Sequence, residues 1–320
     1  MGQFDSIKRD PWMVEQHYLA STREKEQEFA DPDAQALLIG PAEHRHHYRG
    51  LSRDWAHMAL ELAVQRYSGG EPMELVEAYV DYAFAQFARH FSAYPATSEQ
   101  LRPWVSDEYR LALWLLSLAV LCGYPERVDQ VLGWLNQDDE RSPDLLLHRL
   151  FQRLGKAYPG TSLLHPEPYG ALLESLDLKG PAQHDALMHY LGQWYANAHV
   201  CYWHERHTRA RSDHLGYWAF EAALVAFLWS VQGDGLKSAP HFYPQALIER
   251  AHYRRLGKQF RDPETARRED APGWPSGTPC PWPGYYVCVE RMVGEQVFMH
   301  QAPFPEIDGQ VVHWRLSRTF

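Results

Sequence analysis

The sequence predicts an all-α protein, a two-domain helical bundle with a small C-terminal β appendage. Apolar residues recur at about 3.6-residue spacing in roughly ten or eleven segments before residue 261. Gly and Pro separate these segments at short intervals, which favours short connections between helices. Beyond Ala271, Pro and Gly become dense, and the remaining apolar runs are short and rich in β-branched and aromatic residues. No fixed-period repeat is visible.

The N-terminal half reads as a series of helices whose ends carry ordinary stop and start signals. Ser68, Gly69 and Gly70 form a glycine stop, and Pro72 suits the first turn of the next helix. Asp107 and Glu108 favour a helix start because acidic side chains complement the helix dipole there. We expect helices over residues 11–29, 33–67 with a pause at 40–41, 72–91, 106–122, 125–135 and 144–154.

The C-terminal half continues with helices and ends in short strands. We expect helices over 172–176, 180–207, 215–231 and 241–260, then two or three strands within 285–293, 296–301 and 310–316. A Pro/Gly/His-rich link near residue 160 marks the best domain boundary. The predicted parts are therefore an N-terminal helical domain (1–156), a C-terminal helical domain (165–270) and a tail (271–320).

The predicted helix 215–231, LGYWAFEAALVAFLWSV, is apolar on every face and should be a central core helix. Its only ionisable residue is Glu221. Because a buried carboxylate needs a partner, we expect a His, Arg, Tyr or Trp donor beside it; the alternative is a catalytic carboxylate. We assign Glu221, Trp218 and Tyr243 to the structural core.

Composition excludes several classes of protein. Net charge is −10, and residues 61–200 hold 10 basic and 18 acidic side chains, so a basic partner is favoured and direct nucleic-acid binding is not. Four scattered cysteines argue against a disulfide scaffold and for a reducing compartment. No secretory signal or long apolar segment is visible, so we expect a cytoplasmic protein that does not bind membranes.

Motifs for chemistry are scarce. Phosphate loops, nucleophile elbows and zincin motifs are missing from the sequence. In HVCYWHERH, a helix would place Cys201, His204 and Glu205 on one face, but His207 would point elsewhere, so surface or core histidines are favoured over a metal site. No cofactor or metal is therefore predicted.

The densest acidic patch is the candidate partner-binding site. It comprises Asp138, Asp139, Glu140 and Asp144, in a predicted loop and the helix start that follows. Two interpretations stay open: these residues cap a helix and are solvated, or they face a basic partner.

Four segments resemble the PoNi-like immunity proteins of bacteria, a family with two all-helical domains. They are RDWAHMALELAVQRYSGG (53–70), YRLALWLLSLAVLCG (109–123), YWAFEAALVAFLW (217–229) and YPQALIERA (243–251). The tail after Ala271 departs from the usual end of the family.

The resemblance implies a non-enzymatic immunity protein that binds and neutralises a cognate nuclease toxin. Such toxins resemble DNases of the restriction-endonuclease fold and belong to type VI or similar contact-dependent secretion. An acidic helical body suits the basic cleft of a nuclease. Two alternatives are a helical hydrolase using Glu221 with His199 or His204, and a helical scaffold that binds another basic partner.

Overall fold

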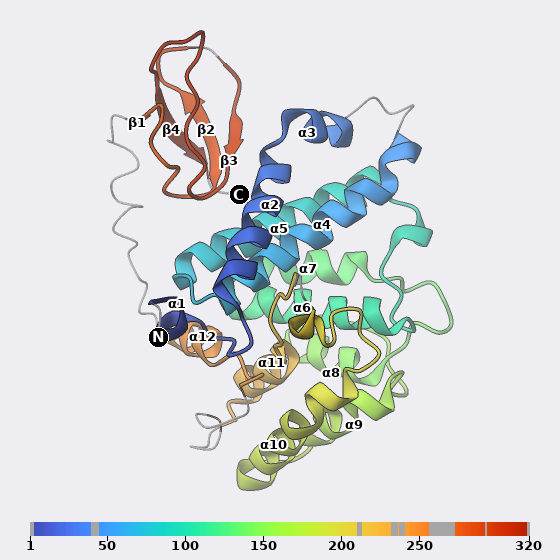
Figure 1. Ribbon diagram of the computed structural model, residues 1–320. Coiled ribbons are helices and arrows are strands. Elements are labelled where there is room, and N and C mark those ends of the chain that lie inside the picture. The colour runs from blue at the N-terminus through green and yellow to red at the C-terminus, as the bar shows by residue number, and fades with distance from the viewer. Residues whose placement is uncertain are drawn as a thin grey trace. The chain divides into compact units, whose positions relative to one another are not determined.

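The computed structural model describes residues 3–39, 45–209, 213–231, 236, 241–255, 273–291 and 293–318 (Figure 1). Within these residues lie twelve α-helices and a four-stranded antiparallel sheet at the C-terminal end. This confirms the predicted fold class. Two compact units form: unit 1 joins Met1–Met13 to Phe91–Lys258, and unit 2 joins Val14–His90 to Gln259–Phe320. The predicted divide at 156–165 falls inside unit 1.

The helices of unit 2 form a layered bundle around aromatic side chains. They are α2 (Glu15–Ala30), α3 (Pro32–Ile39), α4 (Arg45–Ser68) and most of α5 (Met73–Ala93). Helices α2 and α3 both pack on α4. The Phe29 ring meets Trp55 and Tyr82 edge-on at centroid distances of 5.1 and 5.2 Å. The expected pause at 40–41 lies outside the described residues.

Unit 1 is arranged around α6, whose residues are mostly buried. Helix α6 contacts α7, α11 and α12, and α9 runs along α10 (Figure 1). The helices of this unit are α1 (Gln3–Ile7), α6 (Ser106–Leu121), α7 (Pro125–Trp134), α8 (Leu145–Arg153), α9 (Pro166–Ser175), α10 (Gly180–Asn197), α11 (Phe220–Trp229) and α12 (Gln245–Arg255).

The core helix α11 is shorter than predicted, because it starts at Phe220 and not at Leu215. The preceding residues make tertiary backbone hydrogen bonds: the Tyr217 N–H donates to Asp10 and the Ala219 N–H to the Phe242 carbonyl. Gly216 also adopts a φ of +103°, which helices exclude. Ser230, with a left-handed φ of 55°, ends the helix.

Helix α10 likewise stops early, at Asn197 and not near His207. Turns and a short 3-10 helix, Arg206–Thr208, follow it. Glu205 has a left-handed φ of 59°, so the chain reverses where a continuous helix was expected.

Arginines from neighbouring segments complete the ends of both buried helices. Arg254 donates to the Leu121 carbonyl at the end of α6 (2.8 Å). Arg153 donates to the Leu228 carbonyl at the end of α11 through two nitrogens (3.1 and 3.0 Å). These contacts satisfy carbonyls that a helix cannot pair internally and place positive charge at the negative end of its dipole.

The C-terminal appendage has four strands, where two or three were expected. They are β1 (Trp274–Pro275), β2 (Gly284–Cys288), β3 (Gln296–Phe298) and β4 (His313–Arg318), in the order β1-β4-β2-β3. The extra strand, β1, is two residues long and contains Pro, so it lacks the alternating pattern that reveals a strand. Tyr286, Phe304 and Trp314 fill the core of the sheet.

None of the described helices combines the length and apolar character that crossing a bilayer requires. All four cysteines are free, buried thiols.

Candidate interaction site

The acidic loop, residues 137–144, connects α7 to α8 and is held by backbone pairing on its N-terminal side. The Leu101 N–H donates to the Trp134 carbonyl, and the Asn136 N–H donates to the Leu101 carbonyl, both at 2.8 Å. The Asn136 side-chain oxygen then accepts from the N–H groups of Asp138 (3.1 Å) and Asp139 (3.2 Å). The backbone that carries the acidic residues is therefore ordered before any partner binds.

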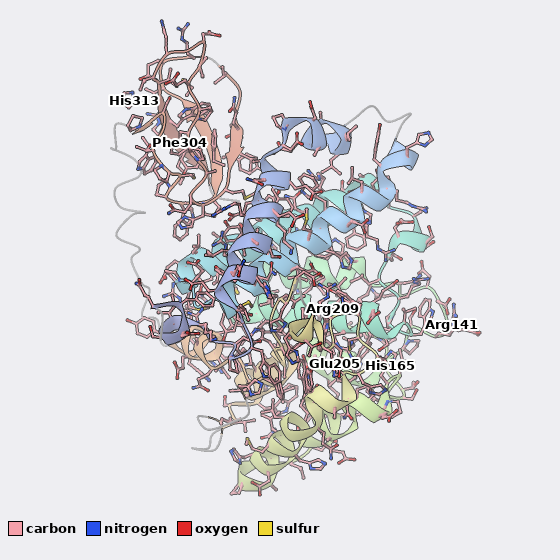
Figure 2. All side chains as sticks on the ribbon, viewed as in Figure 1. Arg141, His165, Glu205, Arg209, Phe304 and His313 are labelled. Carbon is pink, nitrogen blue, oxygen red and sulfur yellow. The ribbon has the colours of Figure 1, made fainter. Side chains whose placement is uncertain are left out.

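The loop presents two exposed carboxylates, on Asp138 and Glu140. Asp139 is half-buried and accepts from Arg141 Nε (2.8 Å) and Nη2 (2.7 Å). The Arg141 guanidinium lies 4.3 Å from the Trp104 ring centroid, at the surface (Figure 2). Hydrogen bonds from the Arg141 side chain and backbone lower the pKa of Asp139 to about 2. Asp139 is therefore neutralised locally.

Asp144 is fully buried and organises the end of the acidic loop. Its Oδ1 accepts from the Leu147 N–H (2.8 Å), as the N-cap of α8, and from the Tyr109 hydroxyl (2.9 Å). Its Oδ2 accepts from the Leu164 N–H (2.8 Å). With all three donors in place, Asp144 is a capping residue and has no surface to offer a partner.

The segment after α8 folds back onto this loop. Tyr158 donates its hydroxyl to the Ser142 carbonyl (2.7 Å), and the Asp144 N–H donates to the Pro159 carbonyl (3.1 Å). A Cβ at Gly160 would lie 2.5 Å from the Asp144 carbonyl oxygen, so only glycine allows this approach. Beside the loop opens a hollow of about 700 Å³, lined by Gln137, His148, Gln152, Gly155, Lys156, Ala157, Tyr158 and Pro159.

Glu221 lies in the core of unit 1, together with Trp218 and Tyr243. Glu221 Oε1 accepts from the Tyr190 hydroxyl and from Trp194 Nε1, both at 2.6 Å. Burial raises the pKa of this carboxyl, although the two donors and Arg110 act in the opposite direction. The hydrogen-bond donors to Glu221 are thus a tyrosine and a tryptophan, two of the four residue types expected beside it.

The histidines that a hydrolase would need are engaged elsewhere. His199 is exposed and its Nδ1 lies 3.0 Å from the Ala196 carbonyl oxygen. His204 stacks on the Tyr195 ring at a centroid distance of 4.4 Å. The side chains that bond Glu221 are Tyr190 and Trp194 and not these two histidines, so the structure does not assemble the acid/base pair of that alternative.

The segment HVCYWHERH (199–207) lies in turns and the start of a short 3-10 helix, and not on a continuous α-helix. Cys201, His204 and Glu205 are therefore not placed together on one helix face. Cys201 is buried, and burial raises its pKa to about 12. His207 Nδ1 is 2.8 Å from the Tyr217 hydroxyl. In the part of the chain that the structure describes, no three His, Cys, Asp or Glu side chains are arranged to hold a metal ion.

Sequence reasoning missed the residues that hold the acidic loop in place. Asn136, Arg141 and Trp104 give the loop its geometry, and only Asn136 carried a local signal, as a turn-forming residue just before the acidic run. The stacking of Arg141 on Trp104 joins residues 37 positions apart in the chain, which no local pattern reveals.

Comparison with known proteins identifies the class and then the family. The family described as PoNe immunity protein (PoNi), N-terminal, matches residues 9–134, and its C-terminal counterpart matches 142–247. The protein is thus a non-enzymatic immunity protein, a class in which each member neutralises a cognate toxin. The chain belongs to the PoNi family, and the partner this implies is a PoNe toxin.

The fold is similar to a solved structure, the crystal structure of protein PA2201 from Pseudomonas aeruginosa. The TM-score is 0.62 at 20% sequence identity, over 77% of this chain and 91% of that chain. No curated protein matches the chain.

Proposed function

We propose that this protein acts in the cytoplasm of the producing cell, where it neutralises a nuclease toxin of the restriction-endonuclease fold. In this proposal, a type VI or similar contact-dependent secretion system delivers the toxin. The acidic surface of the immunity protein occupies the basic cleft through which the toxin would grip DNA, so neutralisation needs no bond making or breaking.

The ordered acidic loop is the observation that carries this mechanism. Asp138 and Glu140 project from a backbone already fixed by Asn136, so docking costs little ordering entropy. Of the four acidic residues predicted to face a partner, we retain Asp138 and Glu140 as direct contacts. Asp139 takes part only if Arg141 releases it, and Asp144 supports the loop from within. The chain's net charge of −10 would steer a basic partner toward it.

Co-expression with the product of the gene immediately upstream tests the function. Cells that make this toxin should survive only when the immunity protein is also made. Equal killing with and without it would reject the proposal.

A charge-matched pair of variants tests the mechanism. Asp138→Asn with Glu140→Gln should slow association with an inactivated toxin by about 3–10-fold at low salt, and the difference should shrink at high salt. Glu167→Gln with Asp185→Asn removes the same charge from other exposed positions of unit 1 and should change the rate by less than about twofold. Equal effects from the two pairs would exclude the acidic loop as the contact.

A further inference from the structure

The C-terminal sheet is an addition to the part of the chain that defines the family. The two family matches end at residue 247, and the strands begin at Trp274. The sheet has its own buried core, including Cys280, Tyr286, Phe304 and Trp314. It is therefore a separately packed element within unit 2, which the family fold by itself does not require.

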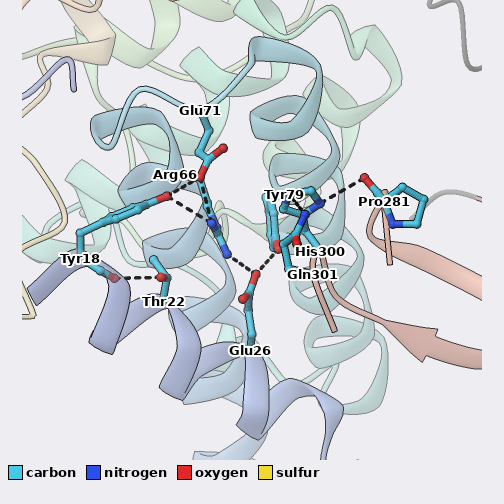
Figure 3. A network of polar contacts seen from close by, with 9 residues as sticks. All are labelled: Tyr18, Thr22, Glu26, Arg66, Glu71, Tyr79, Pro281, His300 and Gln301. Atoms are coloured by element: carbon cyan, nitrogen blue, oxygen red, sulfur yellow. Dashed lines mark hydrogen bonds and ion pairs between the residues drawn. The ribbon is translucent and has the colours of Figure 1, made fainter. Parts of the chain in front are cut away.

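A buried polar network joins this sheet to the helices of unit 2 (Figure 3). Arg66 on α4 donates to Glu26 on α2 (2.5 Å) and to Glu71 (3.1 Å). The Tyr79 hydroxyl on α5 donates to Glu26 and accepts from the backbone N–H of His300. The segment that follows β3 is thus anchored to the helical bundle at a specific point.

Beside this anchor lies a groove of about 880 Å³ between α2 and the sheet segment. One wall is a stripe of α2 at helical spacing: Leu19, Thr22, Arg23, Glu26, Gln27 and Ala30. The other wall is formed by residues 295–298 and 300–303, which include all of β3. The charged side chains that line the groove are two cations, Arg23 and Arg66, and two anions, Glu26 and Glu295, so the groove has little net charge of its own.

The chemistry of the β3 wall selects an extended polypeptide. In the described sheet, β3 is an edge strand that pairs only with β2. Alternate backbone N–H and C=O groups of an antiparallel edge strand face away from its neighbour and can pair with a further strand. An added strand would use these groups and place every second side chain against the mixed apolar, polar and charged side chains of the α2 stripe.

We propose that the groove between α2 and β3 binds an extended segment of the cognate toxin by strand addition to β3. This inference rests on the proposed function, because it takes the toxin as the partner. An immunity protein must discriminate its own toxin from related ones, and an element outside the family-matched residues is suited to supply that specificity.

A matched pair of tryptophan variants tests the inference in the full chain. Ala30 lines the groove, and Ala20 is exposed on the same helix but outside the groove. The probe is the toxic domain of the protein encoded upstream, inactivated by an active-site substitution. Ala30→Trp should weaken its binding at least about tenfold by filling the groove, whereas Ala20→Trp should change the dissociation constant less than about twofold. Backbone amides of 295–298 should exchange hydrogen more slowly in the complex.

The outcomes separate the two proposals. If the wild-type protein neither protects cells nor binds the toxin, the proposed function fails, and this inference fails with it. If the wild-type protein protects but Ala30→Trp binds as tightly as Ala20→Trp, only the groove is excluded. Should Ala30→Trp not fold, as judged by circular dichroism, Gln27→Trp replaces it. Unchanged exchange at 295–298 in the wild-type complex would reject strand addition without any substitution.

Discussion

Two buried carboxylates of unit 1 and one buried ionic network of unit 2 are stabilised in different ways. In unit 1, Asp144 and Glu221 are surrounded by neutral donors: backbone N–H groups, tyrosine hydroxyls and a tryptophan N–H. In unit 2, the Arg66 cation lies between the carboxylates of Glu26 and Glu71.

The two arrangements differ in which groups are left without a partner when one side chain is substituted. A carboxylate held by neutral donors can become protonated or be replaced by an amide while most of its hydrogen bonds stay in place. A cation held between two carboxylates leaves two buried like charges behind when it is removed. Removing Arg66 should therefore lower the free energy of unfolding more than replacing a buried carboxylate of unit 1. For those carboxylates, the loss should depend on how many of their hydrogen bonds the new side chain can still accept.

The largest effect is expected for Arg66→Met, which should destabilise unit 2 by about 3–5 kcal/mol because Glu26 and Glu71 lose their counter-ion. Chemical denaturation, with hydrogen exchange in α4 and α5, measures the loss. Arg23→Met on exposed α2 surface is the control and should stay within about 0.5 kcal/mol. A loss at Arg66 no larger than at Arg23 would contradict the comparison.

Asp144→Ala should cost about 2–3 kcal/mol, because it removes the N-cap of α8 and the partners of Tyr109 and Leu164. Asp144→Asn keeps one acceptor oxygen and should cost less. Asp138→Ala, in the same loop but exposed, should change the free energy of unfolding by under about 0.5 kcal/mol. If Asp138→Ala and Asp144→Ala were equally destabilising, the structural role given to Asp144 would be wrong.

Glu221→Gln should change stability by only about 1 kcal/mol at neutral pH, since the amide oxygen can accept from Tyr190 and Trp194. Burial raises the pKa of Glu221 above its ordinary 4.5. At pH values between the unfolded-state pKa and the higher folded-state pKa, the folded state therefore holds a proton that the unfolded state has lost. Wild-type stability must then fall as pH rises through this window. The stability of the Gln variant relative to wild type should rise with pH. Parallel thermal-unfolding curves from pH 4 to 8 would contradict a raised pKa.

A pH dependence of the opposite sign is expected at His90 in unit 2. Burial lowers the pKa of His90 from 6.5 to about 4. Between these values the unfolded state binds the extra proton, so this histidine makes unit 2 less stable as pH falls from 6.5 toward 4. An NMR titration of the His90 ring measures the pKa directly. A midpoint near 6.5 would show that the ring is hydrated in the folded protein.

The ends of a helix could be predicted where residues close in the sequence determine them. Helices α4 to α8 lie close to their expected ranges, since apolar period, capping and glycine stops act within a few residues. The prediction was wrong at the start of α2, which is Glu15 and not Pro11, and at the start of α9, which is Pro166 and not Leu172. It was also wrong at the start of α11 and the end of α10. There, Asp10 and the Phe242 carbonyl bind backbone N–H groups before α11, and Glu205 reverses the chain after α10.

The sequence by itself determined the fold class, the family resemblance, the acidic character of the chain and the need for a partner at Glu221. Each of these follows from residue type and spacing. Only the tertiary structure decided that Tyr190 and Trp194, 31 and 27 positions away, are the donors at Glu221. It also separated Asp138 and Glu140, which are exposed, from Asp144, which is buried. Adjacent carboxylates look alike in a sequence, and their exposure depends on which distant donors the fold brings to each.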